Sequence, residues 1–354
     1  MIDIRGLLSD AAKKGASDVH ICCDASPRYR IHGKLTDSHL QKLSQSDCLA
    51  VLLDLIDEEQ RSAFEKDGVI DASVSFGEGR FRVNAYKQRG AITIAIRIVD
   101  TVLPDPSQLS IPGQVQNFAK LDRGLVIISG PSGSGKSTVL ATLLDLINSN
   151  EEKNIITLED PIEYLHEHKL SIVNQREIGI DAASYEEALD CALREDPDVI
   201  FVSRVDTKKE LMAILRAVEN GKLVFCASFF TAARDVIAGF VDLFEGSEKT
   251  SALFRLASAL EGVVCRQLLP TKDGSRRAVY EVLIADSEVR NTIRAGKLSL
   301  LSSLLHKGHD RGMFTMDESI LGLYRNGIID ADTAVRYSEN TDVMKSLVSP
   351  SLNR

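Results

Sequence analysis

Tryptophan is absent from this sequence, and aromatic residues make up only 5% of its 354 positions. So few rings leave no obvious platform on which the bases of single-stranded nucleic acid could stack. Positive charge is also scarce, since 42 lysines and arginines stand against 51 acidic residues and give a formal net charge of −9. Nucleic-acid binding through counterion release depends on basic side chains. We therefore expect no nucleic-acid partner.

The cysteine spacing of metal and redox motifs is missing as well. No two of the six cysteines have the C-x-x-C spacing that marks zinc ribbons and redox motifs. A disulfide framework is not indicated either, and a reducing compartment is the simpler interpretation. The six are Cys22, Cys23, Cys48, Cys191, Cys226 and Cys265.

Long apolar runs are the third absence. No segment reaches the roughly 18 apolar residues of a membrane-spanning helix. Residues 1–15 mix charges of both signs and do not resemble a signal peptide. We expect a soluble, cytoplasmic protein, and its length corresponds to two or three domains of about 100–200 residues each.

The sequence pattern divides the chain into four parts. Residues 1–102 combine a short amphipathic helix, ending near Gly15, with alternating strands at 28–32 and 80–86, and so predict an α+β domain. Residues 103–118 hold three prolines and a glycine, which is typical of a linker. Residues 119–298 form the next part, and residues 299–354 have a helical pattern.

The pattern of the third part predicts an α/β fold with a parallel sheet. Apolar runs at 125–128, 155–158, 199–202 and 223–225 lack the polar alternation of half-exposed strands, so each is expected to be buried on both faces. Between the first two runs, Leu140, Leu143, Leu144 and Ile147 recur at helical spacing. Strand–helix–strand repetition of this kind places helices on both faces of a parallel sheet.

A phosphate-binding motif follows the first buried strand. Residues 130–137, GPSGSGKS, match the G-x-x-x-x-G-K-[ST] pattern at every fixed position and directly precede a helix. Glycines let backbone N–H groups curl around phosphate oxygens, and the helix N-terminus adds positive potential. Lys136 is expected to reach the β- and γ-phosphates and the Ser137 hydroxyl to hold Mg²⁺. We therefore predict a nucleotide-binding domain.

An acidic cluster lies at the end of the second buried strand, within residues 157–163, TLEDPIE. Ligands of such sheets bind outside the carboxyl ends of the strands. Glu159 is thus a candidate general base that orients or deprotonates a water attacking the γ-phosphate. The alternative is a solvated acidic turn without a catalytic role.

The ordered set of motifs resembles the hexameric secretion ATPases, most closely the type IV pilus retraction ATPase family of PilT and its paralogue PilU. The motif at 289–294 resembles a segment that marks retraction ATPases, and a tetracysteine element is absent. The resemblance covers nearly the whole chain, and beside the phosphate-binding motif it lies in residues 15–21, 30–33, 81–84, 157–163, 173–177, 192–198 and 289–294.

The resemblance implies an N-terminal PAS-like domain followed by a RecA-like P-loop ATPase domain. It also implies a ring of six chains with ATP and Mg²⁺ between subunits, acting on the pilus platform protein at the inner membrane. Glu159 and Lys136 carry over as catalytic residues and Ser137 as the metal ligand. The implied nucleotide-binding residues are Gly130, Pro131, Ser132, Gly133, Ser134, Gly135, Lys136, Ser137, Thr138 and, from the N-terminal domain, Arg82 and Arg97.

Three positions depart from the family pattern. Arg204 stands where the family has a Walker B glutamate, and a guanidinium cannot ligate a cation. Either it turns away from the metal or it replaces the metal as counter-charge to the phosphates, and Asp206 could supply a substitute ligand if the register slips. Phe229 aligns with a histidine that contacts the γ-phosphate, and Gly239 with an arginine.

These departures leave several functions open. The chain could be a retraction ATPase paralogue with slow or absent hydrolysis, in a homo-hexamer or in a mixed ring with an active paralogue. It could instead be a fully active motor, since Glu159 and Lys136 remain, or a non-hydrolysing ATP-binding regulatory subunit. A nucleic-acid motor is disfavoured by charge and composition. Arg290 and Arg294, four residues apart on one helix face, belong either to the retraction segment or to a solvated basic face.

Overall fold

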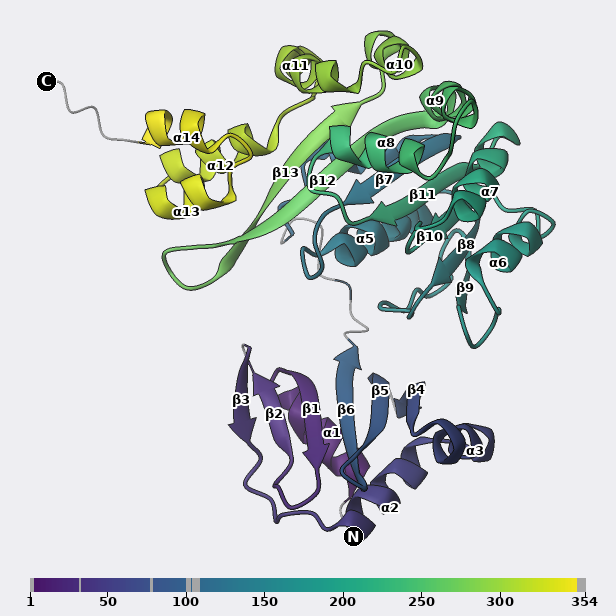
Figure 1. Cartoon of the computed structure of the whole chain (residues 1–354), viewed down its shortest axis with the longest axis vertical. Helices are drawn as coiled ribbons and strands as arrows, with labels where there is room; N and C mark the ends of the chain where they lie inside the picture. Colours follow the sequence, from purple (N-terminus) through teal and green to yellow (C-terminus); the bar gives the residue numbers. More distant parts are fainter. Residues whose placement is uncertain (1–2, 32, 77–78, 100–102, 104–108, 349–354) are drawn as a thin grey trace, which may run out of the picture. The chain divides into compact units, whose positions relative to one another are not determined.

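A computed structural model describes residues 3–31, 33–76, 79–99, 103 and 109–348 (Figure 1). The chain divides into two compact units, residues 1–102 and 103–354. The second unit includes the segments predicted as linker, nucleotide-binding domain and C-terminal helices. His32 and residues 104–108, which belong to a predicted strand and to the predicted linker, lie outside the described residues.

The first unit is an α+β domain with one antiparallel sheet. The strand order is β3-β2-β1-β6-β5-β4. Alternating burial along β5 places Phe81, Val83 and Ala85 in the core, as the alternation of the sequence predicts. Its elements are α1 (Ile4–Lys13), β1 (Ala16–Cys22), β2 (Arg28–Ile31), β3 (Lys34–Asp37), α2 (Gln45–Leu55), α3 (Glu58–Asp67), β4 (Val69–Phe76), β5 (Gly79–Gln88) and β6 (Ala91–Val99).

The second unit is built on a seven-stranded mixed sheet of order β13-β12-β7-β11-β10-β8-β9. The four buried runs predicted from the sequence form β7, β8, β10 and β11, which is confirmed by their parallel pairing at the centre of the sheet. The β12–β13 pair is antiparallel, so the sheet is mixed rather than wholly parallel. The strands are β7 (Gly124–Ser129), β8 (Asn154–Glu159), β9 (Ile172–Glu177), β10 (Val199–Val202), β11 (Leu223–Ser228), β12 (Leu260–Pro270) and β13 (Arg276–Ile284).

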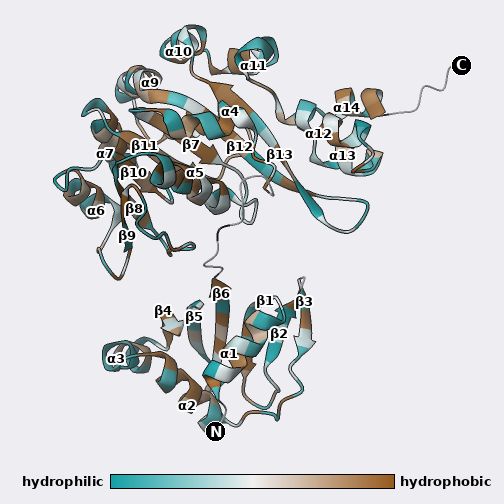
Figure 2. Cartoon of the chain, turned by 180° about the vertical axis from the view of Figure 1, so that it is seen from behind, coloured by the Kyte–Doolittle hydropathy of each residue, from teal (hydrophilic) through white to brown (hydrophobic). Residues whose placement is uncertain are grey.

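Each face of this sheet has its own hydrophobic core. Leu125 and Ile127 of β7 face one core, and Val126 and Ile128 face the other. Figure 2 shows the resulting hydrophobic colouring along the central strands. The helices before and around the sheet are α4 (Gly113–Gln116), the 3₁₀ turn Asn117–Lys120, α5 (Lys136–Asn150), α6 (Tyr185–Ala192), α7 (Lys208–Glu219), α8 (Ala233–Asp242) and α9 (Glu248–Ala259).

The C-terminal part is helical, as its sequence pattern predicts. Ile320 and Met344 of these helices are buried in the same core as α7 and α9, so the region packs onto the sheet domain. Among the described helices, none has the length and apolar character needed to cross a membrane. The elements are α10 (Ser287–Arg294), α11 (Leu301–Lys307), α12 (Met316–Arg325), α13 (Ala331–Tyr337), α14 (Thr341–Val348) and 3₁₀ turns at Leu298–Leu300 and His309–Arg311.

Candidate functional site

The phosphate-binding motif forms the connection between β7 and α5. Gly130, Gly133 and Gly135 all have positive φ, at 148°, 74° and 84°. At Gly130 a Cβ atom would overlap the backbone oxygen of Arg266, and at Gly135 it would overlap the Arg266 guanidinium. Glycine is therefore required at both positions for two reasons. The positive φ disfavours a residue with a side chain, and Arg266 leaves no space for a Cβ atom. The backbone amides of the loop lie at the N-terminus of α5, and N–H groups at a helix N-terminus stabilise a bound anion.

Lys136 is the first residue of α5 and folds back over the loop. Its Nζ donates hydrogen bonds to the carbonyl oxygens of Gly130 (2.8 Å) and Pro131 (3.1 Å). The ring centroid of Phe229 lies 4.5 Å from the same Nζ, a cation–π contact. Burial lowers the pKa of Lys136, because removal from water disfavours its charged form. These partners hold the lysine ready beside the phosphate-binding amides.

Two carboxylates lie beside the start of α5. The Ser137 hydroxyl donates to Glu163 Oε1 at 2.8 Å. Glu159, at the end of β8, is buried and accepts hydrogen bonds from Thr157 (2.6 Å) and Gln175 (3.0 Å). Ser137, Glu159 and Glu163 line one small pocket. The sequence pattern predicts a role for Glu159. Glu163 belongs to the same acidic cluster, but only the folded loop shows that it is the carboxylate bonded to Ser137.

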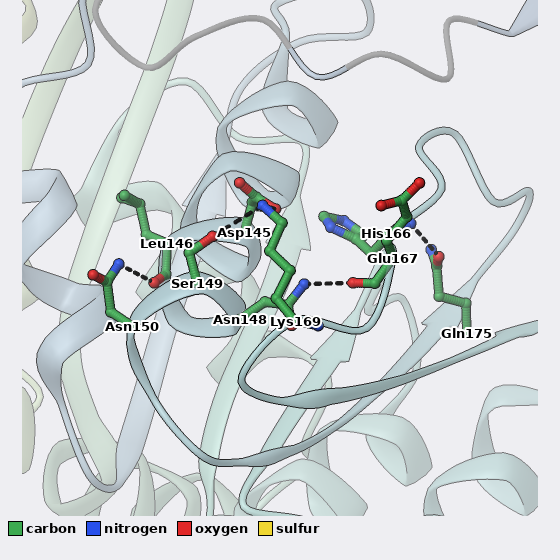
Figure 3. Close-up of polar contacts among 9 residues, drawn as sticks. All are labelled: Asp145, Leu146, Asn148, Ser149, Asn150, His166, Glu167, Lys169 and Gln175. Atoms are coloured by element: carbon green, nitrogen blue, oxygen red, sulfur yellow. Dashed lines mark hydrogen bonds and ion pairs between the residues drawn. The ribbon is translucent and has the colours of Figure 1, made fainter.

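A polar clamp fixes the loop that carries Glu163 (Figure 3). From α5, Asn148 donates to the Glu167 carbonyl (2.7 Å) and accepts from the Lys169 amide (3.1 Å). The Lys169 side chain in turn donates at 2.6 Å to Asp145, which lies on α5 like Asn148. From β9, Gln175 accepts from the His166 amide and donates to the Tyr164 carbonyl, both at 2.8 Å. The clamp couples the position of Glu163 to α5 and β9.

The buried environment of Glu159 raises the pKa of its carboxyl group toward neutral pH. Burial raises the pKa of Glu159 to about 7, and the hydrogen bonds from Thr157 and Gln175 only partly oppose this. Burial likewise raises the pKa of Glu281, on β13, to about 7. A carboxyl with such a pKa can exchange a proton at physiological pH, which suits a general base.

The raised pKa of Glu159 predicts that stability falls as pH rises. The folded chain keeps this proton up to about pH 7, whereas the unfolded chain releases it near 4.5. The folded state therefore binds more protons between these values, and the free energy of unfolding decreases across that window by about 1.4 kcal/mol per unit of pKa difference. Glu159→Gln should flatten the decrease measured by urea denaturation at pH 5, 6, 7 and 8. Glu281→Gln should flatten it independently, and an unchanged slope in Glu159→Gln would contradict the burial of an ionisable group there.

Arg204 follows β10 and is engaged by two carboxylates. Its Nε lies 2.9 Å from Asp206 and its Nη2 3.7 Å from Asp160. Its guanidinium also lies 5.7 Å from the Tyr185 ring centroid. These contacts occupy the Arg204 guanidinium with carboxylates of the same chain. Asp206, considered as a substitute metal ligand, is here the ion-pair partner of Arg204.

The segment after β11 brings two phenylalanines to the phosphate-binding loop. Ser129, at the end of β7, donates to the Phe230 carbonyl at 2.6 Å. Phe229 projects over Lys136, and the Phe230 ring fills the space that a side chain at Gly239 would need. The two predicted departures, Phe229 and Gly239, are thus parts of one local packing arrangement.

The remaining predicted residues lie elsewhere. Arg82 and Arg97 face each other across β5 and β6 in the N-terminal unit. Their carboxylate partners are Asp71 at 3.8 Å for Arg82 and Asp18 at 2.9 Å for Arg97.

The two arginines of α10 differ, since Arg290 is half-buried and held by several contacts whereas Arg294 is exposed. Arg290 donates to the Ala257 and Ser258 carbonyls at the end of α9 and pairs with Glu261 at 2.8 Å. Arg294 lies 5.6 Å from the Phe254 ring centroid.

The residues present fit a nucleotide and its cation. Gly130 and Gly135 leave no room for a Cβ, and the Ser134 hydroxyl is buried there without a hydrogen-bond partner among the described residues. Ser137 and Glu163 place two oxygen atoms 2.8 Å apart, and oxygen is the ligand type that Mg²⁺ prefers. The loop can therefore cradle phosphates, with an oxygen donor pair at its edge.

Comparisons with known proteins agree with this geometry. The family described as type II/IV secretion system protein matches residues 1–293. The type IV pilus retractation ATPase PilT of Pseudomonas aeruginosa is 35% identical over 336 residues, covering 94% of this chain and 97% of that protein. The type IV pilus ATPase PilU of the same organism is 32% identical over 349 residues, covering 98% and 91%. A crystal structure of the pilus retraction motor PilT with bound ADP superimposes with a TM-score of 0.92 at 35% identity, covering 98% of this chain and all of that one.

Proposed function

Because this chain belongs to the type II/IV secretion system protein family, we propose that it is an ATP-binding subunit of a type IV pilus retraction motor. The single observation that carries the proposal is the phosphate-binding loop between β7 and α5, with Lys136 folded over its glycines. The similarity to a PilT structure over 98% of the chain supports the same assignment.

Each residue around the loop has a defined task in this proposal. Lys136 leaves the carbonyls of Gly130 and Pro131 and pairs with the β- and γ-phosphates. Ser137 and Glu163 hold Mg²⁺, which supplies charge neutralisation of the phosphates when bound. Glu159, with its pKa near 7, takes the proton of the attacking water.

We further propose that hydrolysis is slow. The position after Ser203 carries an arginine paired with Asp160 and Asp206, so it adds no carboxylate to the metal side. Phe229 places a ring without hydrogen-bond donors beside Lys136, where a γ-phosphate contact is needed. Loss of one transition-state donor typically lowers the rate by about 10²–10³. The same two residues favour a second candidate, a regulatory subunit that binds ATP without turnover.

The proposed assembly is a ring, either of six identical chains or mixed with an active paralogue. Arg82 and Arg97 would face the phosphates bound by a neighbouring subunit, exchanging their carboxylate partners Asp71 and Asp18 for that ligand. The ring would act on the pilus platform protein from the cytoplasmic side of the inner membrane. No nucleic acid enters this function.

Nucleotide binding tests the proposal directly. Fluorescent ADP and ATP analogues should bind the full chain, and Lys136→Ala should weaken binding by about 10–100-fold, since hydrogen bonds to charged groups are worth about 1.5–3 kcal/mol. Lys209→Ala, which removes an exposed lysine of α7 paired with Glu186 and outside the site, is the matched control and should bind normally. Native mass spectrometry of the same samples should detect a hexamer with nucleotide. A chain that binds no adenine nucleotide would overturn the proposal.

A further inference from the structure

Arg266 lies directly beneath the phosphate-binding loop, inside the sheet. It belongs to β12, one residue beyond the point where Cys265 pairs with Ser129 at the end of β7. Across the sheet it faces Tyr280 of β13, whose ring centroid is 5.6 Å from the guanidinium. Only 4% of Arg266 is exposed. A full positive charge is thus buried under the loop.

The contacts of this guanidinium are unusual for a buried cation. Its Nη1 donates to the Gly135 carbonyl, and its Nε has no hydrogen-bond partner among the described residues. Burial lowers the pKa of Arg266, and among the described residues the opposing contributions come from Tyr280 and Tyr164 rather than from a carboxylate. Buried charges are costly unless they are paired. The charge therefore calls for an anion that the described chain does not itself supply.

The bond to Gly135 also sets the direction of a peptide group. In a planar trans peptide the carbonyl and the following N–H point in opposite directions. Because the Gly135 carbonyl accepts a hydrogen bond from Arg266, the Lys136 N–H points away from that guanidinium. Val139 donates to the same carbonyl from within α5, so the peptide is held from two sides.

The charges on the other side of the site differ. Arg204 cannot ligate a metal, and its guanidinium is paired with the carboxylates of Asp160 and Asp206. The fixed guanidinium of Arg266 can therefore balance phosphate charge from beneath the loop, while Ser137 and Glu163 provide oxygen ligands at the metal edge. An arginine cannot be deprotonated in proteins under ordinary conditions and keeps this charge at any working pH.

We propose that Arg266 is a positioning residue for nucleotide phosphates, which fixes the Gly135–Lys136 peptide and supplies a buried positive charge that makes nucleotide binding nearly independent of divalent cation. This inference rests on the proposed nucleotide-binding function. It assigns to Arg266 part of the charge neutralisation that Mg²⁺ supplies in other nucleotide sites.

Calorimetric titration of the full chain with ADP, in excess Mg²⁺ and in EDTA, tests the proposal. The unaltered chain should bind ADP with dissociation constants within about threefold of each other in the two buffers. Arg266→Gln, which keeps a donor but removes the charge, should weaken binding in EDTA by about tenfold or more and restore a dependence on Mg²⁺. Arg216→Gln, which removes a surface arginine paired with Asp190, is the matched control and should leave both constants unchanged.

Separate outcomes distinguish the two proposals. If the unaltered chain binds ADP only with Mg²⁺, or if folded Arg266→Gln binds as tightly in EDTA as the unaltered chain, the role of Arg266 is wrong while nucleotide binding stands. If no ADP binds in either buffer, the proposed function fails instead. Should Arg266→Gln unfold, as judged by thermal denaturation, Arg266→Lys replaces it; it keeps the charge but loses the planar fork. Retained binding in EDTA with a loss smaller than tenfold would then support the charge as the main contribution.

Discussion

Replacing Arg204 with glutamate and Phe229 with histidine in one chain is expected to raise the steady-state ATPase rate by about a hundredfold or more. The first change restores a carboxylate beside Ser203, which lines the same pocket as Ser137, Glu159 and Glu163. The second replaces a ring that cannot donate hydrogen bonds with one that can, next to Lys136. Each contact restored to a transition state is worth about 10²–10³ in rate.

The size of the effect depends on how freely the new side chains can move into place. Arg204 is 44% exposed, so its replacement requires no repacking of the core, but Asp160 and Asp206 would then repel the new carboxylate. Phe229 is half exposed as well. We therefore expect the single variants to gain less than the double variant, which the coupled-enzyme assay of phosphate release can measure.

A matched double variant controls for unspecific effects. Arg216→Glu with Phe254→His makes the same chemical changes at exposed positions of α7 and α9 and should leave the rate unchanged. An unaltered chain that already turns over at about 1 s⁻¹, a rate in the ordinary range of enzymes, would contradict slow hydrolysis. So would an Arg204→Glu, Phe229→His chain that is no faster than the unaltered one.

Gly130→Ala is expected to destabilise the protein by about 2–5 kcal/mol and to abolish measurable nucleotide binding. The new Cβ would overlap the Arg266 backbone oxygen, and backbone of a central sheet cannot move aside cheaply. The positive φ of 148° adds strain for any residue with a side chain. Strained backbone and overpacking each cost about 1–3 kcal/mol. Urea denaturation and ADP titration measure the two effects.

Gly133→Ala tests the cost of a side chain at positive φ without any steric overlap. Gly133 also has positive φ, at 74°, but a Cβ there would meet nothing within 4 Å. Its cost should therefore be close to 1 kcal/mol, well below that of Gly130→Ala. Equal destabilisation by the two substitutions would mean that Arg266 does not limit the space beneath the loop.

The central architecture could be predicted because its signals are local. The runs at β7, β8, β10 and β11 are apolar throughout, since both faces of these strands are covered. The phosphate-binding motif specifies its own loop and the start of α5. The edge strands β9 and β13 mix polar and apolar residues, and their pairing, like that of β12 beside β13, depends on distant partners.

The parts of the site that were missed depend on tertiary contacts. Glu163 reaches Ser137 only because Gln175 and Asn148 fix the intervening loop, and neither residue is adjacent to it in sequence. Arg266 is visible in the sequence as the single charged residue in the otherwise mostly apolar run of residues 262–269. Its meaning required the parallel pairing of β12 with β7, which brings it under Gly135.

A crystal structure of the chain grown with ADP and Mg²⁺ tests the central claim most directly. The account predicts phosphates on the amides of residues 131–137 and Lys136 Nζ moved from the Gly130 and Pro131 carbonyls to the phosphate oxygens. It also predicts that the Arg266 guanidinium remains bonded to Gly135. Nucleotide absent from the loop at saturating concentration, with Lys136 still on both carbonyls and Phe229 still over it, would contradict the account.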